Sequence, residues 1–554
     1  MFSPVVGIRF LALLALVCAC QPRQEASSEP GAFVGSCAAA LPCSGNVTIR
    51  GENTLAAAQM CTTISGYLVV DSPSEIELPC LAAVAGGLDV DSDIEQLDLP
   101  ALRSVDDRTR IENNTVLEDL EGLAVLQNIS GGLVILHNDA LIDLGGLAAL
   151  ARVGGEFNIG HNKSMSSLGR LPELEVVGGD LLICGNDALS TLGDMPVLKT
   201  VYGGLTIDSN HALTSLDGLS GLEVVHGDLI VEENPGLTSF GDPSVLTQVG
   251  GSLEIFRNEQ LASLEGLDRL QSIGWNLWVE DNPELTDLAS LSALESIGGA
   301  LVVENNDALT SLVGLRGLAS LGHMELIDNI ALTSLQGLSP AATLTGSLWL
   351  ASLPSLHDLS GLPPITMLNG DLHVWDNAAL ESFAGLEQLG SVGACLSIIG
   401  NPSLTSVDGL DGLSNVMGYL DITDNETLRS LEGLAGLSLV GERLTISQNP
   451  VLSSLLGLES LTSVDGHVYV QNNASLTSTS ELTGLRHVGS DLNITDNSAL
   501  RDVDLPALEV VGRDLNIYDN PYLCQAEAEA LAARIQVSRE ASIHDNGSAR
   551  TDCD

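Results

Sequence analysis

The side chains best suited to recognition in this sequence are aromatic residues that recur at fixed places in a repeated pattern. Three of the four Trp stand beside alternating aliphatic residues, so we expect them to point away from the core. Exposed aromatic groups mark interaction sites, and Trp contributes much of the binding energy at interfaces. We therefore expect a binding strip over about residues 254–375; the alternative is that these rings only cover a sheet thinned by glycine. The candidate ligand-binding residues are Phe256, Trp278, Trp349, His373 and Trp375.

Carboxylates occupy a neighbouring outward column, at Asp208, Glu232, Glu280 and Glu304. Like charges about 5 Å apart repel unless cations or solvent intervene, and oxygen-rich groups suit calcium. A solvated acidic face is favoured over weak calcium binding. Glu280 and Glu304 also suggest the acid–base pair of a carbohydrate-active enzyme, although a regular column is poor evidence for tuned pKa values.

The sequence indicates no metal centre or cofactor. It contains no C-x-x-C or H-E-x-x-H grouping. Cys184 and Cys395 lie about nine coils apart, roughly 40 Å at the spacing of β-strands, whereas a disulfide needs Cα atoms within about 7 Å. Packing or free thiols are therefore favoured over metal ligation for these two residues.

One repeat positions all of these side chains. Its pattern is N-x-x-L-x-x-L-x-G-L-x-x-L-x-x-V-G-G-x-L-x-I-x-x-N, as in residues 138–162. One rung carries Leu353 in place of Asn, and looser units come before the regular series, for about 21 coils in all. The Asn recurs, mostly every 24 residues, at 114, 138, 162, 186, 210, 234, 258, 282, 306, 329, 377, 401, 425, 449, 473, 497 and 520.

The spacing predicts a mainly-β parallel solenoid with one strand in each coil. In L-x-I the two apolar side chains point the same way, and stacked coils bury them together. We expect the Gly-Gly pairs, such as Gly178-Gly179, to supply backbone angles that other residues resist, and the Asn amides to bind backbone groups at the bend. The expected parts are loose coils at 37–113, the regular array at 114–523 and a cap at 524–554 with a helix over 525–538. The buried face of that helix should hold Cys524, Ala528, Leu531 and Ile535.

Composition narrows the function. The 554 residues include 73 Asp and Glu against 21 Lys and Arg, a net charge of −52, which argues against nucleic acid as a partner. Hydrophobic residues make up 44% of the chain, so it is not an acidic disordered protein. The low aromatic content of 3% agrees with a slim core filled by Leu, Ile and Val.

The first residues indicate export. Residues 1–19 hold Arg9 and a short apolar run, which is typical of a signal peptide and too short to span a bilayer. The sequence Val17-Cys18-Ala19-Cys20 resembles the lipobox of bacterial lipoproteins, and the resemblance implies a lipidated Cys20 at the outer membrane, followed by a flexible tether over 20–36. The alternative is a plain signal peptide with a chance cysteine.

A family resemblance covers residues 37–554. The opening, Cys43 to Cys61 followed by Thr-Thr-Ile-Ser-Gly-Tyr-Leu, resembles receptor L domains, and units such as 213–234 are similar to bacterial surface lipoproteins with receptor-L-like and leucine-rich-repeat-like arrays. This resemblance implies a right-handed parallel β-solenoid, a recognition role and a Cys43–Cys61 disulfide. Cys37 and Cys80 remain as a further candidate pair, and Cys524 and Cys553 bracket the C-terminal segment and are expected to pair.

We therefore expect a non-enzymatic recognition or adhesion protein, anchored in the envelope, that binds a protein or glycan ligand and uses no cofactor. A passive envelope spacer and a carbohydrate-active β-helix enzyme are the alternatives.

Overall fold

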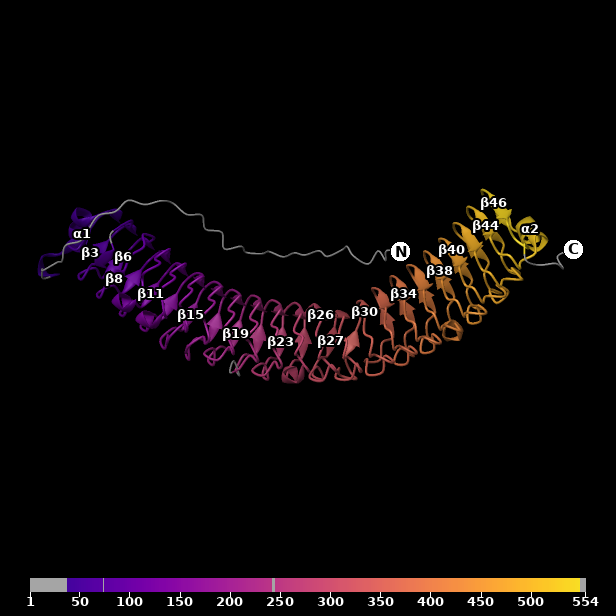
Figure 1. The fold of residues 1–554 in the computed structure, drawn as a ribbon, viewed down its shortest axis with the longest axis horizontal. Helices are drawn as coiled ribbons and strands as arrows, with labels where there is room; N and C mark the ends of the chain where they lie inside the picture. Colours follow the sequence, from indigo (N-terminus) through magenta and orange to yellow (C-terminus); the bar gives the residue numbers. More distant parts are fainter. Residues whose placement is uncertain (1–36, 73, 242–244, 549–554) are drawn as a thin grey trace.

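A computed structural model describes residues 37–72, 74–241 and 245–548. The predicted signal peptide, Cys20, the predicted tether and Cys553 lie outside the described residues. Within them the chain winds into one elongated, curved array, with the two caps at its ends (Figure 1). The prediction of a mainly-β parallel solenoid of about 21 turns is confirmed.

One strand from each coil joins a single long sheet. Every neighbouring pair is parallel, and the repeat sets the register, with Leu205 opposite Leu229 and Ile207 opposite Val231. Its 22 strands are β2 (Val47–Ile49), β4 (Leu68–Val70), β7 (Leu88–Val90), β10 (Thr109–Glu112), β12 (Leu133–Leu136), β14 (Phe157–Gly160), β16 (Leu181–Cys184), β18 (Leu205–Asp208), β20 (Leu229–Glu232), β22 (Leu253–Phe256), β24 (Leu277–Glu280), β26 (Ala300–Glu304), β28 (His323–Ile327), β30 (Leu348–Ala351), β32 (Leu372–Trp375), β34 (Leu396–Ile399), β36 (Leu420–Thr423), β38 (Leu444–Ser447), β40 (Val468–Gln471), β42 (Leu492–Thr495), β44 (Leu515–Tyr518) and β46 (Ala541–His544).

The expectation of one strand per coil is wrong, because each coil contributes a second, short strand. In the regular coils it contains two residues, and the second of them is buried, as at Val153 and Val177. These strands form the short-strand stack, which is broken into three parts of 12, 2 and 8 strands. The parts are β1 (Leu41–Cys43), β3 (Cys61–Ile64), β6 (Ala83–Val84), β9 (Ser104–Val105), β11 (Asn128–Ile129), β13 (Arg152–Val153), β15 (Val176–Val177), β17 (Thr200–Val201), β19 (Val224–Val225), β21 (Gln248–Val249), β23 (Ser272–Ile273) and β25 (Ser296–Ile297); then β27 (Ser320–Leu321) and β29 (Thr343–Leu344); then β31 (Met367–Leu368), β33 (Ser391–Val392), β35 (Asn415–Val416), β37 (Leu439–Val440), β39 (Ser463–Val464), β41 (His487–Val488), β43 (Val510–Val511) and β45 (Gln536–Val537). A separate pair, β5 (Glu75–Glu77) and β8 (Gln96–Asp98), lies in the loose coils.

The core runs the length of the array between these strands. Leu, Ile and Val from every coil form one continuous buried cluster. Phe157, Phe240 and Phe383 are the largest side chains fully buried in it. No coil encloses this core alone, so each depends on its neighbours for burial.

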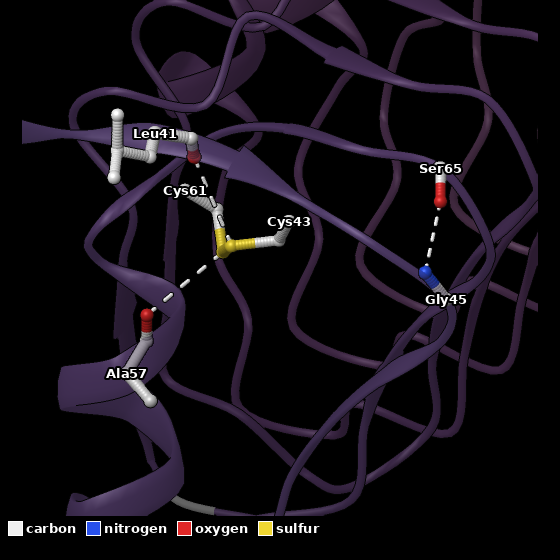
Figure 2. Close-up of a disulfide and its surroundings, with 6 residues drawn as sticks. All are labelled: Leu41, Cys43, Gly45, Ala57, Cys61 and Ser65. Atoms are coloured by element: carbon white, nitrogen blue, oxygen red, sulfur yellow. Dashed lines mark hydrogen bonds between the residues drawn. A yellow bond between two sulfur atoms is a disulfide. The ribbon is translucent and has the colours of Figure 1, made fainter.

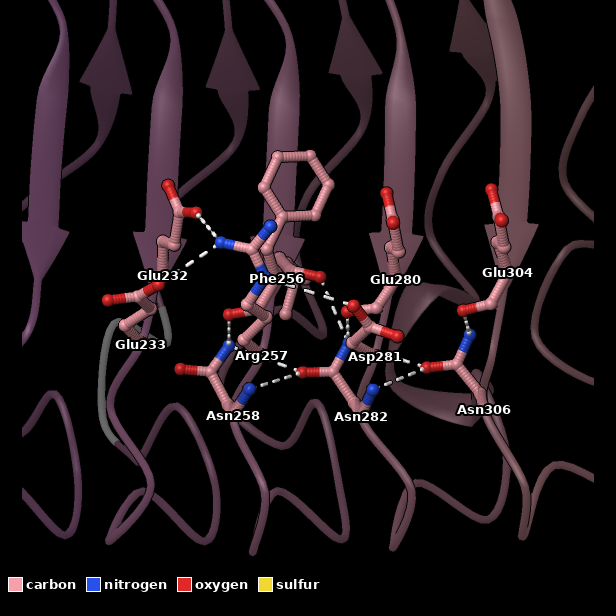
Figure 3. Close-up of polar contacts among 11 residues, drawn as sticks. Glu232, Glu233, Phe256, Arg257, Asn258, Glu280, Asp281, Asn282, Glu304 and Asn306 are labelled. Carbon is pink, nitrogen blue, oxygen red and sulfur yellow. Dashed lines mark hydrogen bonds and ion pairs between the residues drawn. The ribbon is translucent and has the colours of Figure 1, made fainter. Parts of the chain in front are cut away.

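The Asn residues form a buried ladder at the bends after the strands of the long sheet from β10 to β44, except after β30, where Leu353 takes the place of Asn. The side-chain amide of Asn258 donates to the carbonyls of Val231 and Phe256, and its Oδ1 accepts from the backbone N–H of Asn234 at 3.2 Å. Figure 3 shows the ladder from Asn258 through Asn282 to Asn306. The predicted role of these Asn in binding backbone groups is confirmed.

The expected reason for the Gly-Gly pairs is wrong. Gly178 does not adopt a positive φ; instead, a Cβ there would lie 2.2 Å from the carbonyl oxygen of Gly154 in the preceding coil. Close stacking of backbones therefore excludes a side chain at this turn. Positive φ is found at the residue before each Asn instead, as at Asp281 with φ 56°.

The N-terminal cap combines a helix with two disulfides. Cys43 pairs with Cys61, as the resemblance implies, and Cys37 pairs with Cys80. Helix α1 (Glu52–Ala58), which sequence patterning did not indicate, lies beside the first of these (Figure 2), and the 3-10 helix η1 (Cys37–Ala39) carries the start of the second. The other 3-10 helices are η2 (Glu121–Leu123), η3 (Gly145–Leu147), η4 (Ala289–Leu291) and η5 (Glu432–Leu434).

The C-terminal cap contains α2 (Gln525–Arg534), which ends four residues before the predicted boundary at 538. It ends there because Gln536–Val537 pair with β43 as β45. Its predicted inner face is buried, and Cys524 is disulfide-bonded, although the expected partner Cys553 lies outside the described residues. Among the helices in the described part of the chain, none combines the length and apolar composition that a membrane span requires.

Candidate ligand-binding face

Three columns of side chains stand on the outward face of the long sheet. In each coil they are the residue before the L-x-I segment, the residue within it and the residue after it. The strand register places equivalent residues side by side, so Glu325, Trp349 and His373 are consecutive members of the middle column. Parallel strands lie about 4.8 Å apart, so a large ring in one coil reaches the rings of the next.

Four rings on this face pack together as the Trp349 cluster, defined as His323, Trp349, His373 and Trp375. Trp349 packs edge to face against His373, with ring centroids 4.9 Å apart and planes at 85°. His373 lies 4.5 Å from Trp375, and His323 contacts Trp349 from the preceding strand at 6.0 Å. The cluster therefore crosses three consecutive strands, β28, β30 and β32.

His373 is much less exposed than we expect of an outward-pointing ligand-binding residue. It lies on the outward side of the sheet, but it is only 5% exposed because it is packed between two indole rings. Burial lowers the pKa of His373, and the carboxylate of Asp371, 3.9 Å from its Nε2, opposes that shift. At neutral pH this imidazole is an uncharged part of the support beneath the Trp rings.

Several polar atoms of the face have no hydrogen-bond partner among the described residues. They are the indole Nε1 atoms of Trp278, Trp349 and Trp375 and the Nδ1 atom of His373. An unpartnered buried polar group costs free energy, commonly about 1–3 kcal/mol. A ligand that shifted these rings slightly and accepted their hydrogen bonds would recover that cost.

The other predicted aromatic residues form a separate pair. Phe256 and Trp278 pack edge to face with centroids 5.2 Å apart. Glu254 stands beside Trp278 in register, and burial raises its pKa to about 6, with Asp228 and Glu232 adding to the shift. Strand β26, with Val302 beside Trp278, separates this pair from the Trp349 cluster, so the expected strip consists of two groups.

The expected carboxylate column is interrupted. Phe256 stands between Glu232 and Glu280, as Figure 3 shows. In this column the neighbours of Glu280 in register are therefore Phe256 on one strand and Glu304 on the other. Arg257 binds Glu232 at 2.9 Å and Glu233 at 3.1 Å. Burial raises the pKa of Glu232, and the nearby Asp208 adds to that rise while Arg257 opposes it. Within residues 37–72, 74–241 and 245–548, no group of three or more His, Cys, Asp or Glu has the geometry to hold a metal ion.

The two mid-chain cysteines lie far apart in the array. Cys184 is at the end of β16, and Cys395 directly precedes β34, nine strands further along the long sheet. Cys395 is a half-buried free thiol whose pKa is raised, chiefly by burial.

Trp275 is an exposed Trp that does not lie on a strand of the long sheet. It stands in a Gly-Gly turn and is 68% exposed, more than any Trp of the long sheet. In the sequence, Trp275 takes the place of the second glycine of the turn, which is Gly251 in the preceding coil and Gly299 in the following coil. Sequence patterning placed Trp275 in this turn, but it missed His323 as a cluster member, because His323 precedes the L-x-I segment.

Part of the chain is similar to a known family. Residues 394–535, a minor part of the chain, match the family model described as Receptor L domain. A solved structure titled "Crystal structure of TLR13-ssRNA13 complex" aligns with 84% of this chain and 91% of that chain, at 15% identity and a TM-score of 0.20. No curated protein matches this sequence.

Proposed function

We propose that this protein is a non-enzymatic recognition or adhesion protein of the cell envelope that binds a protein or glycan ligand on its long sheet. The observation that carries the proposal is the Trp349 cluster, in which rings from three strands gather at one place. Aromatic groups gathered on a surface are typical of interfaces. The match to the Receptor L domain model adds support for a recognition role.

The binding test compares the wild-type chain with the double variant Trp349→Ala/Trp375→Ala on glycan arrays and on envelope and host-surface extracts, with and without calcium. We expect the double variant to lose at least about tenfold in affinity, since aromatic hot spots commonly contribute 2 kcal/mol or more. Trp275→Ala is the matched control, because it removes an exposed Trp outside the long sheet. Unchanged binding of the double variant to every glycan and extract would contradict the proposal. A wild-type chain with no partner, whose deletion alters the envelope mechanically, would favour a passive spacer.

Catalysis is the competing function. Glu280 and Glu304 stand side by side in register on adjacent strands, so they are the pair of carboxylates that a carbohydrate-active enzyme would use on this face. Regular rows of carboxylates are also common on acidic surfaces, so we propose that these two residues are not catalytic. Polysaccharide cleavage that Glu280→Gln abolishes would reverse this conclusion.

We further propose that the chain is exported and held at the bacterial outer membrane by lipid on Cys20. The two disulfides of the N-terminal cap support an oxidising compartment. The lipid would be the membrane contact, and the net charge of −52 disfavours both anionic lipid and nucleic acid as partners of the body. Mass spectrometry should find acyl chains on Cys20, and Cys20→Ala should move the protein to the soluble fraction. Membrane retention of that variant would contradict lipid anchoring.

A further inference from the structure

The Asn ladder is interrupted at one rung in the middle of the array. At this rung the backbone N–H of Leu353 still donates to Asn377 Oδ1 at 3.0 Å. Leu353 itself has no side-chain oxygen to accept from Asn329 and no amide to donate to neighbouring carbonyls. Its side chain is fully buried, as the Asn of the regular rungs are. The Leu353 rung is therefore hydrogen-bonded through the ladder to Asn377 but not to Asn329.

The short-strand stack is interrupted directly after the Leu353 coil, which contains β29 and β30, because β29 and β31 do not pair. It is interrupted again one interface before that coil, between β25 and β27, whereas β27 and β29 stay paired. Its 12-stranded part ends at β25, β27 and β29 form a separate pair, and the 8-stranded part begins at β31. The coil from Asn306 to Asn329 is also one residue shorter than most, at 23 residues. A short coil alone does not cause a break, because β41 and β43 stay paired across the 23-residue step from Asn497 to Asn520.

The long sheet continues across this region. Strand β30 pairs with β28 on one side and with β32 on the other. The Trp349 cluster adds contacts over the same strands, since Trp349 meets His323 of β28 and both His373 and Trp375 of β32. These contacts add to the backbone hydrogen bonds that still join the coils there, such as the one from the Asn369 N–H to the Thr345 carbonyl at 2.8 Å.

We propose that residues 329–377 form a joint that divides the solenoid into two separately stabilised segments, and that the Trp349 cluster braces this joint. In a repeat array each coil is stabilised by its neighbours, so the array opens first at its weakest interface. The ladder is interrupted between Asn329 and Leu353, and the short-strand stack is interrupted between the Leu353 coil and the next coil, where β29 and β31 do not pair. The rings cross both interfaces of the Leu353 coil. The joint does not depend on whether the cluster binds a ligand.

Hydrogen exchange measured by mass spectrometry on the full chain tests the joint directly. Backbone amides in 329–377 should exchange at least about tenfold faster than those in 401–449, since hydrogen bonds are lost there and about 1.4 kcal/mol changes an opening equilibrium tenfold. Residues 401–449 are the internal reference, because there Asn425 donates to the Ile398 and Thr423 carbonyls and β33, β35 and β37 are paired. Equal protection of the two regions would overturn the proposal.

Repair of the rung is the second test. Leu353→Asn should slow exchange in 329–377 by about tenfold and leave 401–449 unchanged, because an amide could then serve both neighbours. The reciprocal variant, Asn425→Leu, should speed exchange around its own coil. If Leu353→Asn does not fold, Asn425→Leu decides: unchanged exchange there would show that a lost rung does not weaken the array. A folded Leu353→Asn chain with unchanged exchange would overturn the role of the rung.

The brace has its own variant. Trp349→Ala should speed exchange across 329–377 by more than its effect on 401–449. Tyr469→Ala is the matched control, because Tyr469 is a half-buried outward ring whose stacking partner, His467, belongs to its own coil. It should affect only the coil that it occupies. Equal, local effects of the two variants would show that the cluster does not brace the joint.

Discussion

Trp349 and His373 pack edge to face on adjacent strands, with ring centroids 4.9 Å apart, and this contact helps leave the imidazole only 5% exposed. The pair joins the aromatic surface to a titratable group beneath it. Large rings standing about 4.8 Å apart along a parallel sheet must overlap, so one residue of the outward face becomes the support for the next. The properties of the face therefore depend on groups that a ligand does not touch.

The first prediction concerns pH. Because burial lowers the pKa of His373 in the folded state, its contribution to stability is complete above its unfolded pKa of 6.5 and decreases as the pH falls below that value. The urea midpoint of wild type should drop over this range relative to that of His373→Gln. The facing groups are His323, Glu325 and Asp371, so the comparison must be made as a difference between the two chains. A pH-independent difference would contradict the burial of a neutral imidazole.

Glu254 should show the opposite dependence. Its pKa of about 6 lies above the usual 4.5, so the ionised form disfavours the folded state above pH 6. Glu254→Gln should raise the free energy of unfolding at pH 8 by up to about 1 kcal/mol, a value discounted for partial solvent screening. The difference should disappear below pH 4.5. Glu259→Gln, at an exposed turn position, is the control and should change little.

The ladder predicts a large cost for losing one Asn. Asn258→Ala removes the amide that donates to Val231, Phe256 and Asn282 and the oxygen that accepts from Asn234, all in a buried position, so we expect a loss of about 2–3 kcal/mol. Chemical unfolding followed by circular dichroism measures it. Asn128→Ala, at an exposed position of β11, should cost less than about 0.5 kcal/mol. Similar losses for the two variants would mean that the ladder contributes little to stability.

The Gly-Gly turns predict an intolerance that is steric in origin. A methyl group at Gly178 would lie 2.2 Å from the Gly154 carbonyl oxygen, so Gly178→Ala must push adjacent coils apart and should cost about 2 kcal/mol or more. At Gly390 the nearest atom would be 3.3 Å away, so Gly390→Ala should be far milder. The thermal midpoints of the two variants provide the comparison. A Gly178→Ala chain as stable as Gly390→Ala would show that the coils relax freely.

Sequence patterning predicted the architecture well because the same residue pattern occurs in almost every coil. Each coil presents Leu, Ile and Asn at the same places, so the parallel register and the inward face follow from spacing alone. The short strands escaped notice, since a two-residue segment carries almost no periodicity. The Gly-Gly pairs were assigned the wrong cause, because crowding against Gly154 is a relation between coils that the residues of one coil do not display.

For the candidate site, too, the sequence predicted some features and only the structure decided others. Which side of the sheet carries Trp349 and Trp375 follows from alternation along one strand. Whether His373 is exposed depends on rings in the neighbouring coil, and the division of the strip into two groups depends on the strand between them. The pairing of Cys37 with Cys80 was left open by sequence, and the cap geometry decided it.

By itself, the sequence determined a long stack of similar coils, a slim aliphatic core, the buried Asn ladder and the face on which the Trp stand. These are periodic properties, and a period is visible along a single chain. The tertiary structure decided the second strand of each coil, the burial of His373 and the two breaks in the short-strand stack. Each of these arises from contacts between residues about one repeat apart, where packing rather than local preference selects the outcome.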